Sequence, residues 1–259
     1  MNNFFKVWFI YMKASLLARI AYKAEFFISM ISMFALEMVG PLFAYTIYLN
    51  SPGFSGWTFY EIILLQGILL FIKGFSYVTF FGIVWNSNLQ IWRVTFDFML
   101  LKPRNTLLTF IFSSFDTEDN GKMFGGLLLI TIALFNIDFG LSKLLLMILL
   151  IILGIIIFFS IALLFSAFIL RYIQTWRLYE LLDIVLTLAQ YPNNIYPKYV
   201  SVILTSIIPL FVAGVFPAQV LIGEVIPKMM SIIFSVIILL AIGLYTWFSV
   251  LKHYSSAGG

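Results

Sequence analysis

Two charged side chains, Glu37 and Lys73, stand within stretches of the sequence that are otherwise apolar. A charge at the centre of a bilayer costs about 2.5–3.5 kcal/mol on insertion scales, so it faces a partner or a cavity. The two stretches are neighbours and run in opposite directions, which predicts similar depths for the two charges. We therefore expect either a structural ion pair or a role in lining a cavity. One acid and one lysine are too few for a proton relay.

Other groups that could do chemistry are scarce. His253 is the only histidine, the chain has no cysteine, and no paired acids lie deep in an apolar stretch. Hydrolysis inside a membrane needs paired carboxylates, a metal site or an activated nucleophile. The phosphate loop G-x-x-x-x-G-K-[ST] is missing, because Gly121-Lys122 lacks the upstream glycine and the following hydroxyl residue. We expect no catalytic, metal-binding or cofactor-binding residues.

Two further patterns, a pair of acidic residues and the tryptophans, are interpreted as features of the membrane interface. Glu180 and Asp183 are three residues apart and share a helix face, where we expect solvation at the membrane interface or pairing with Arg171 or Arg177. Tryptophans near the ends of apolar stretches predict an interfacial belt rather than a stacking site; they are Trp8, Trp57, Trp85, Trp92, Trp176 and Trp247.

The composition places these residues in a membrane. Of the 259 residues, 63% are hydrophobic and 10% are charged, whereas soluble domains are about half apolar and about a quarter charged. Continuous apolar runs, rather than alternation, predict helices and not a barrel. The net charge of +4 reflects topology rather than a basic patch, so we expect no nucleic-acid partner.

An all-α integral membrane protein with one domain, 1–259, is therefore predicted. Residues 1–24 read as an imperfect amphipathic helix at the interface. Five apolar spans follow from hydropathy: Phe26–Leu49, Trp57–Trp85, Met123–Ile137, Leu144–Leu170 and Met229–Leu251. Of Leu178–Tyr191 and Tyr199–Gly223, one spans and the other does not; hydropathy favours the second, although Pro209, Gly214 and Pro217 interrupt it.

The interval 86–121 is the one long polar segment, and we expect it in water with Asp116, Glu118 and Asp119 exposed. Within it, Phe96 to Asn105 is a short amphipathic run that Pro103 ends. Lys and Arg mark the cytoplasmic side. All of them except Lys73, Lys143, Lys198 and Lys228 fall on one side if the N-terminus is inside, which predicts cytoplasmic termini and a cytoplasmic 86–121 segment.

Several short motifs, in order along nearly the whole chain, resemble the type-2 ATP-binding-cassette (ABC) export permeases, specifically the small six-helix bacterial ones. They are Gly56-Trp57-Thr58-Phe59-Tyr60-Glu61-Ile62, Phe96-Asp97-Phe98-Met99-Leu100-Leu101-Lys102-Pro103, Tyr191-Pro192-Asn193-Asn194-Ile195-Tyr196-Pro197, Ile208-Pro209-Leu210 and Phe216-Pro217-Ala218. No single motif is specific for this family, but the occurrence of all of them in the same order argues against a chance resemblance.

The resemblance implies six transmembrane helices, with Leu178–Tyr191 as the fifth and 199–225 as re-entrant helices outside. It implies a coupling helix between spans 2 and 3, which would contact separate ATPase subunits that bind ATP and Mg; its residues are Asp97, Met99, Leu100, Leu101, Lys102, Pro103 and Arg104. It also implies a second permease, identical or related, a pathway between the two, and the plasma membrane of a bacterium.

The expected function is thus ATP-driven export of an amphiphilic or hydrophobic substrate, such as a drug, peptide or lipid-like molecule. The alternative is a secondary transporter driven by an ion gradient. That class predicts inverted repeats and several acids around broken helices. The sequence shows no repeat, and Glu37 is the single deep acid.

Overall fold

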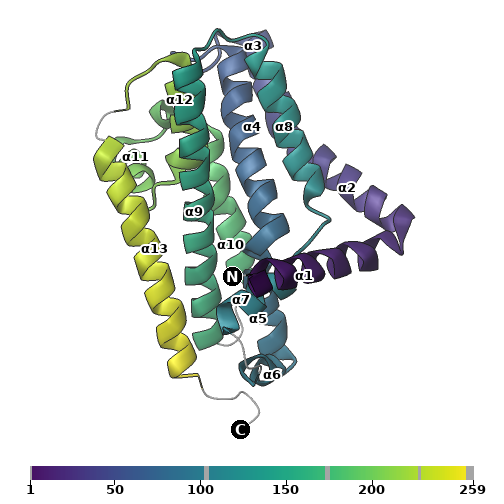
Figure 1. Ribbon diagram of the computed structural model, residues 1–259. Coiled ribbons are helices and arrows are strands. Elements are labelled where there is room, and N and C mark those ends of the chain that lie inside the picture. The colour runs from purple at the N-terminus through teal and green to yellow at the C-terminus, as the bar shows by residue number, and fades with distance from the viewer. Residues whose placement is uncertain (1, 102–104, 173–175, 227–228, 255–259) are drawn as a thin grey trace.

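The computed structural model is an elongated helical bundle with α1 and α2 projecting to one side (Figure 1). It describes residues 2–101, 105–172, 176–226 and 229–254, which contain helices and no strand. The main helices are α1 (Asn2–Ile20), α2 (Lys23–Glu37), α3 (Val39–Asn50), α4 (Phe59–Ser76), α5 (Gly82–Trp92), α8 (Asn120–Leu134), α9 (Leu141–Arg171), α10 (Trp176–Thr187) and α13 (Met229–Lys252). The shorter elements are α6 (Phe96–Leu100), α7 (Thr106–Ser113), α11 (Lys198–Val202), α12 (Val215–Ile222), the π-helical turns η1 (Tyr77–Phe81) and η4 (Ile203–Ile207), and the 3-10 turns η2 (Leu188–Gln190), η3 (Asn193–Ile195) and η5 (Leu210–Ala213).

Four helical stretches in the described part of the chain are long and apolar enough to cross a membrane: Lys23–Asn50, Phe59–Trp92, Leu141–Arg171 and Met229–Lys252. The expected all-helical fold is confirmed for the described residues, and the four long apolar stretches are consistent with an integral membrane protein. The predicted third and fifth spans correspond to α8 and α10, with 15 and 12 residues. At 1.5 Å per residue both are about 20 Å long, shorter than a hydrocarbon core of about 30 Å. Six spans remain a prediction.

The first long stretch bends between α2 and α3, beside Glu37. Pro41 has no backbone N–H, so the Glu37 carbonyl loses the bond that residue 41 would donate, and the proline ring crowds that carbonyl. The helix breaks at Met38 and resumes at Val39. The second long stretch continues past the predicted end at Trp85 to Trp92, with the π-helical turn η1 inserted in it.

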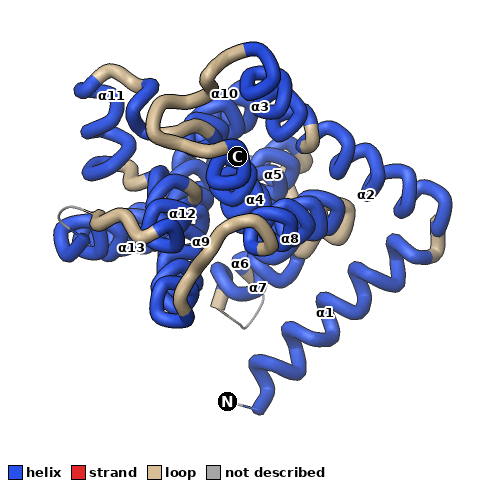
Figure 2. The backbone as a smooth tube through the Cα atoms, turned by 90° about the horizontal axis from the view of Figure 1, so that it is seen from above, coloured by secondary structure: helices blue, strands red, loops and turns tan. Residues whose placement is uncertain are grey.

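Helix α4 occupies the middle of the bundle, with α8 beside it (Figure 2). Glycines allow the close contact between the two helices. A Cβ atom on Gly74 would lie 2.3 Å from the Met123 backbone nitrogen, and one on Gly126 would lie 2.3 Å from the Phe71 nitrogen. Small residues at such contacts are typical of helices that pack in membranes.

The segment between α10 and α13 is broken into short pieces, and its second half is deeply buried. Ala213 and Val215 are fully buried, and η5 and α12 pack against α9. Pro209 precedes η5, and Gly223 ends α12 with φ +96°, a conformation that glycine adopts readily. The predicted interruption of 199–225 is present, and its re-entrant placement stays a prediction.

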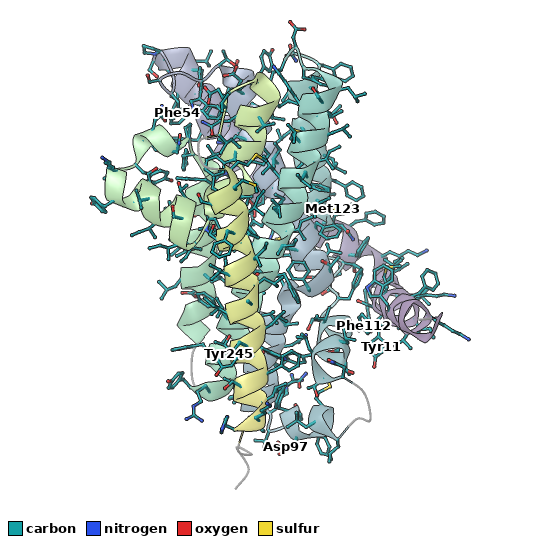
Figure 3. All side chains as sticks on the ribbon, turned by 60° about the vertical axis from the view of Figure 1, so that its left-hand side comes forward. Tyr11, Phe54, Asp97, Phe112, Met123 and Tyr245 are labelled. Atoms are coloured by element: carbon teal, nitrogen blue, oxygen red, sulfur yellow. The ribbon has the colours of Figure 1, made fainter. Side chains whose placement is uncertain are left out.

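Helix α1 lies across the direction of the bundle (Figure 1). The Ser15 hydroxyl donates to the Phe115 carbonyl at 2.9 Å. The rings of Tyr11 and Phe112 lie 6.1 Å apart, where α1 meets α7 (Figure 3). These contacts hold the crossing helix against the bundle, which is the arrangement expected of an interfacial helix.

Candidate functional site

A cluster of five charged side chains joins the elements around the bend after α2. Lys73 Nζ lies 2.9 Å from Glu37 Oε1 and 3.1 Å from Asp183 Oδ1. Lys122 Nζ lies 2.8 Å from Asp119 Oδ1 and 3.9 Å from Glu37 Oε1. The structure therefore brings Glu37 and Lys73 together, and three carboxylates share two ammonium groups.

Tyr77 forms the aromatic side of this cluster. Its hydroxyl donates to Asp183 Oδ1 at 3.0 Å, and its ring centroid lies 4.4 Å from Lys122 Nζ. Tyr77 begins the π-helical turn η1, one turn after Lys73. π-Helical turns are rare and frequent at functional sites. The charge cluster thus lies beside two irregularities of the membrane helices, η1 and the bend at Met38.

The cluster is mostly shielded from solvent, and each charge has an opposite partner. The Lys73 side chain is 8% exposed and that of Lys122 is 10% exposed. Removing one partner of a buried ion pair is costly, because the other charge is left alone. Asp119 precedes α8, outside the candidate spans; burial raises the pKa of its carboxyl group, and the Lys122 ammonium opposes that shift.

Two expectations from the sequence are wrong here. Asp183 is neither simply solvated nor paired with Arg171; it contacts Lys73 and Tyr77. Asp119 was expected in water, but its side chain is 14% exposed. Sequence spacing contained part of the signal, since Asp119 and Lys122 are three residues apart and face one another on a helix. No local sequence pattern could predict that Lys73 pairs with Asp183, because the two residues are far apart in the chain.

Two cavities border the charge cluster. One of ≈450 Å³ is lined by Tyr77, Trp85, Asn86, Asp116 and Lys122, among others. The other, of ≈20 Å³, lies between Lys73 and Gln66 and is large enough for a single water molecule. Gln66 is 2% exposed, and both polar atoms of its side chain lack a hydrogen-bond partner among the described residues. Polar groups thus continue from a wide cavity towards the centre of α4.

Besides the charge cluster and its cavities, the structure has a distinctive surface at the end of the bundle where α6 and the end of α13 lie (Figure 1). We call this region the α6 end. Phe96 is fully buried, whereas Phe98 is 66% exposed and Leu101 is 78% exposed. The Phe96 ring lies 5.8 Å from Phe110 and 5.0 Å from Tyr254. This short helix is therefore anchored on one side and presents apolar side chains on the other.

The anchor continues into the last membrane helix. Phe110 of α7 stacks on Trp247 of α13 with ring centroids 5.7 Å apart, and Trp247 is fully buried. The expectation that tryptophans stay in an interfacial belt is wrong for Trp247. Sequence reasoning missed the roles of Phe96, Phe110 and Trp247. An aromatic residue in a membrane helix, such as Trp247, is equally suited to lipid and to protein neighbours, and the contact of Phe110 with Trp247 joins residues more than a hundred positions apart.

A comparison with protein families decides what kind of molecule carries these features. Residues 17–258 match the model described as ABC-2 family transporter protein. The chain belongs to the ABC-2 transporter family. It is an ABC-2 type permease subunit, a membrane component of a transporter that is not itself catalytic. No curated protein and no solved structure matches the chain.

Four of the seven predicted coupling residues of this ABC-2 permease are described, and they lie at the α6 end. Asp97, Met99 and Leu100 belong to α6, and Leu101 ends it; Asp97 lies at the far end of the bundle (Figure 3). Lys102, Pro103 and Arg104 lie outside the described residues. Among the side chains that the structure does describe, no three His, Asp or Glu residues are placed to hold a metal ion.

Proposed function

We propose that this ABC-2 permease is half of an ATP-driven exporter, with a second permease subunit completing the pathway and separate ATPase subunits driving it. The substrate class that we propose is amphiphilic or hydrophobic: a drug, a peptide or a lipid-like molecule. The membrane is the plasma membrane of a bacterium, and both termini and α6 face the cytoplasm.

The observation that carries the proposal is the two-sided environment of α6. Phe98 and Leu101 are exposed at the tip of the bundle, where solvated apolar side chains favour a protein partner. On the opposite side, Phe96 packs on Phe110, and Phe110 stacks on Trp247. A push on α6 by a partner would therefore reach α13 through direct ring contacts, as a rigid-body transmission requires.

The charge cluster supports the same function as a mechanical junction. Glu37 lies at the end of α2, Lys73 in α4, Lys122 in α8 and Asp183 in α10. These contacts tie the bend of the first long stretch to the centre of the bundle. We propose that the elements around the cluster move together when the pathway opens, and that Glu37 and Lys73 serve this junction.

The test is coexpression with candidate ABC ATPase subunits from the source genome, followed by co-purification and measurement of ATP hydrolysis. Leu101→Glu should weaken binding of the ATPase about 30-fold, because a central apolar contact contributes about 2 kcal/mol or more. Val225→Glu is the matched control, since Val225 is 90% exposed and lies in a different loop; it should bind the ATPase normally.

Two results would contradict the proposal. One is that no ATPase binds the wild-type chain, or that Leu101→Glu and Val225→Glu behave alike. The other is transport by liposomes that contain this chain alone and that stops when an ionophore dissipates the ion gradient. That second result would favour the secondary transporter.

A further inference from the structure

A groove between α9 and α13 at the α6 end has a composition that neither the charge cluster nor the coupling surface explains. Its inner part is a cavity of ≈490 Å³. The lining residues are Leu164, Phe165, Ala167, Phe168, Arg171, Tyr172, Thr246 and Val250. The walls are therefore apolar, and the one charged side chain in the lining is the cation Arg171.

A second cavity extends the first one towards the end of the bundle. It measures ≈580 Å³ and is lined by Arg171, Ser249, Val250 and His253. Because both cavities share Arg171 and Val250, they form one groove with an apolar part and a polar mouth. Each volume lies within the range of about 300–1,000 Å³ that ligand pockets have.

The mouth of the groove carries positive charge and no neutralising partner in the described part of the chain. Arg171 is exposed and makes no ion pair with any described residue. Lys252, next to His253 in the chain, is also exposed. The His253 ring donates through Nδ1 to the Ser249 carbonyl at 2.9 Å, which fixes the ring beside the groove.

The ends of the two helices relate the groove to the depth of lipid headgroups. Arg171 and Lys252 are the last residues of two candidate membrane spans, Leu141–Arg171 and Met229–Lys252. If these helices span the bilayer, their apolar walls face the hydrocarbon and the basic residues at their ends lie near the headgroups. Basic pockets between membrane helices are suited to anionic lipid headgroups.

We propose that this groove is a binding site for an anionic membrane lipid. The lipid phosphate lies against Arg171 at the mouth, with His253 near it, and one acyl chain lies between Leu164 and Phe168 of α9 and Val250 of α13. The arginine guanidinium is well suited to this role, because its planar fork can donate two hydrogen bonds to one phosphate.

The experiment measures lipid binding to the purified full-length chain by native mass spectrometry and by the shift in thermal unfolding. The probes are phosphatidylglycerol, phosphatidylcholine and inorganic phosphate, added in turn to protein in detergent. We expect phosphatidylglycerol to bind and stabilise the chain, phosphatidylcholine to bind several-fold more weakly, and inorganic phosphate to give no shift.

Variants separate the groove from general attraction to a basic surface. Arg171→Gln should weaken phosphatidylglycerol binding about five-fold, since one basic residue near anionic lipid contributes about that factor. Val250→Trp should block the apolar part and lower binding without removing a charge. Arg93→Gln is the control, because Arg93 is exposed at the same end but outside the groove; it should bind as the wild type does.

Equal loss of binding in Arg93→Gln and Arg171→Gln would overturn the proposal, as would equal binding of the two lipids or stabilisation by inorganic phosphate alone. If Arg171→Gln failed to fold, Val250→Trp and the comparison of lipids on the wild-type chain would still decide. This site is independent of the proposed export activity, so a failure of ATPase binding leaves it unaffected.

Discussion

At the scale of single residues, the charge cluster is the feature that most needs a physical reason. Five charges lie together in a chain in which 10% of residues are charged. Each carboxylate contacts an ammonium group, and Tyr77 adds a hydrogen bond to Asp183. Such an arrangement is sensitive to the loss of one member, because the side chains of Glu37 and Lys73 are mostly shielded from solvent and an unpaired charge there is costly.

Lys73→Met tests this dependence. The substitution leaves Glu37 and Asp183 without the ammonium group that contacts both, and we expect stability to fall by about 3–5 kcal/mol. A lower midpoint of thermal unfolding in detergent is the measurement. Lys198→Met, at an exposed lysine, should change little. Adding Glu37→Gln to Lys73→Met should cost much less than the sum of the single effects.

The sequence anticipated only part of this cluster. Glu37 and Lys73 stood out because each interrupts an apolar stretch, and similar depth on neighbouring helices predicted their proximity. Asp183 could not be assigned, since its partner lies more than a hundred residues away and the span that contains it was ambiguous. Asp119 was attributed to an aqueous segment, and Lys122 was counted only among the cytoplasmic basic residues; the fold places both beside the bend of the first stretch.

At the scale of elements, the close packing between α4 and α8 depends on glycines, which have no side chain. Gly74 and Gly126 let each backbone approach the other helix. Lys73 and Lys122, which belong to the same two helices, reach Glu37 from either side. The spacing of the two helices therefore sets the geometry of the charge cluster.

Gly74→Leu should separate α4 from α8. A Cβ at Gly74 would lie 2.3 Å from a backbone nitrogen, so the helices must move apart, and overpacking of this kind costs about 1–3 kcal/mol. The measurement is again the midpoint of thermal unfolding. Gly140→Ala is the control, because the nearest atom to a Cβ there is 4.0 Å away. A variant as stable as the control would contradict the packing described here.

Phe96→Ala should detach α6 from the bundle. Phe96 is fully buried between α7 and the end of α13, whereas Phe98 is 66% exposed. Truncating a buried Phe costs about 3–5 kcal/mol, so we expect faster hydrogen exchange across residues 96–113. Phe98→Ala should leave exchange unchanged. Identical exchange in the two variants would show that α6 has no anchor.

Elements differed in how far the sequence could predict them. The charge-free run in α9 and the interruption between α10 and α13 followed from composition, proline and glycine. The break at Met38 also has a local cause in Pro41. The sequence does not show, however, that the break lies where Glu37 contacts Lys73. The extension of the second stretch to Trp92 was missed, because polar residues such as Asn86 and Ser87 read as a loop; Ser87 is in fact buried against Ser166 of α9.

In the whole molecule, the α6 end is the place where we expect the permease to meet the ATPase that drives it. Phe98 of α6 and Leu101 after it are exposed at the tip of the bundle, and the ring contacts that begin at Phe96 behind them lead into α13. The opposite end carries the loops before α4 and after α8 (Figure 1). These two ends must face different sides of the membrane if the chain works as proposed.

Labelling of single cysteines tests this claim most directly, because the native chain contains no cysteine. In membrane vesicles of known orientation, Leu101→Cys should react with a membrane-impermeant maleimide from the cytoplasmic side only, and bound ATPase should protect it. Gly140→Cys should react from the opposite side and be unaffected by the ATPase. Labelling of Leu101→Cys from outside the cell, or labelling that the ATPase does not slow, would contradict the account.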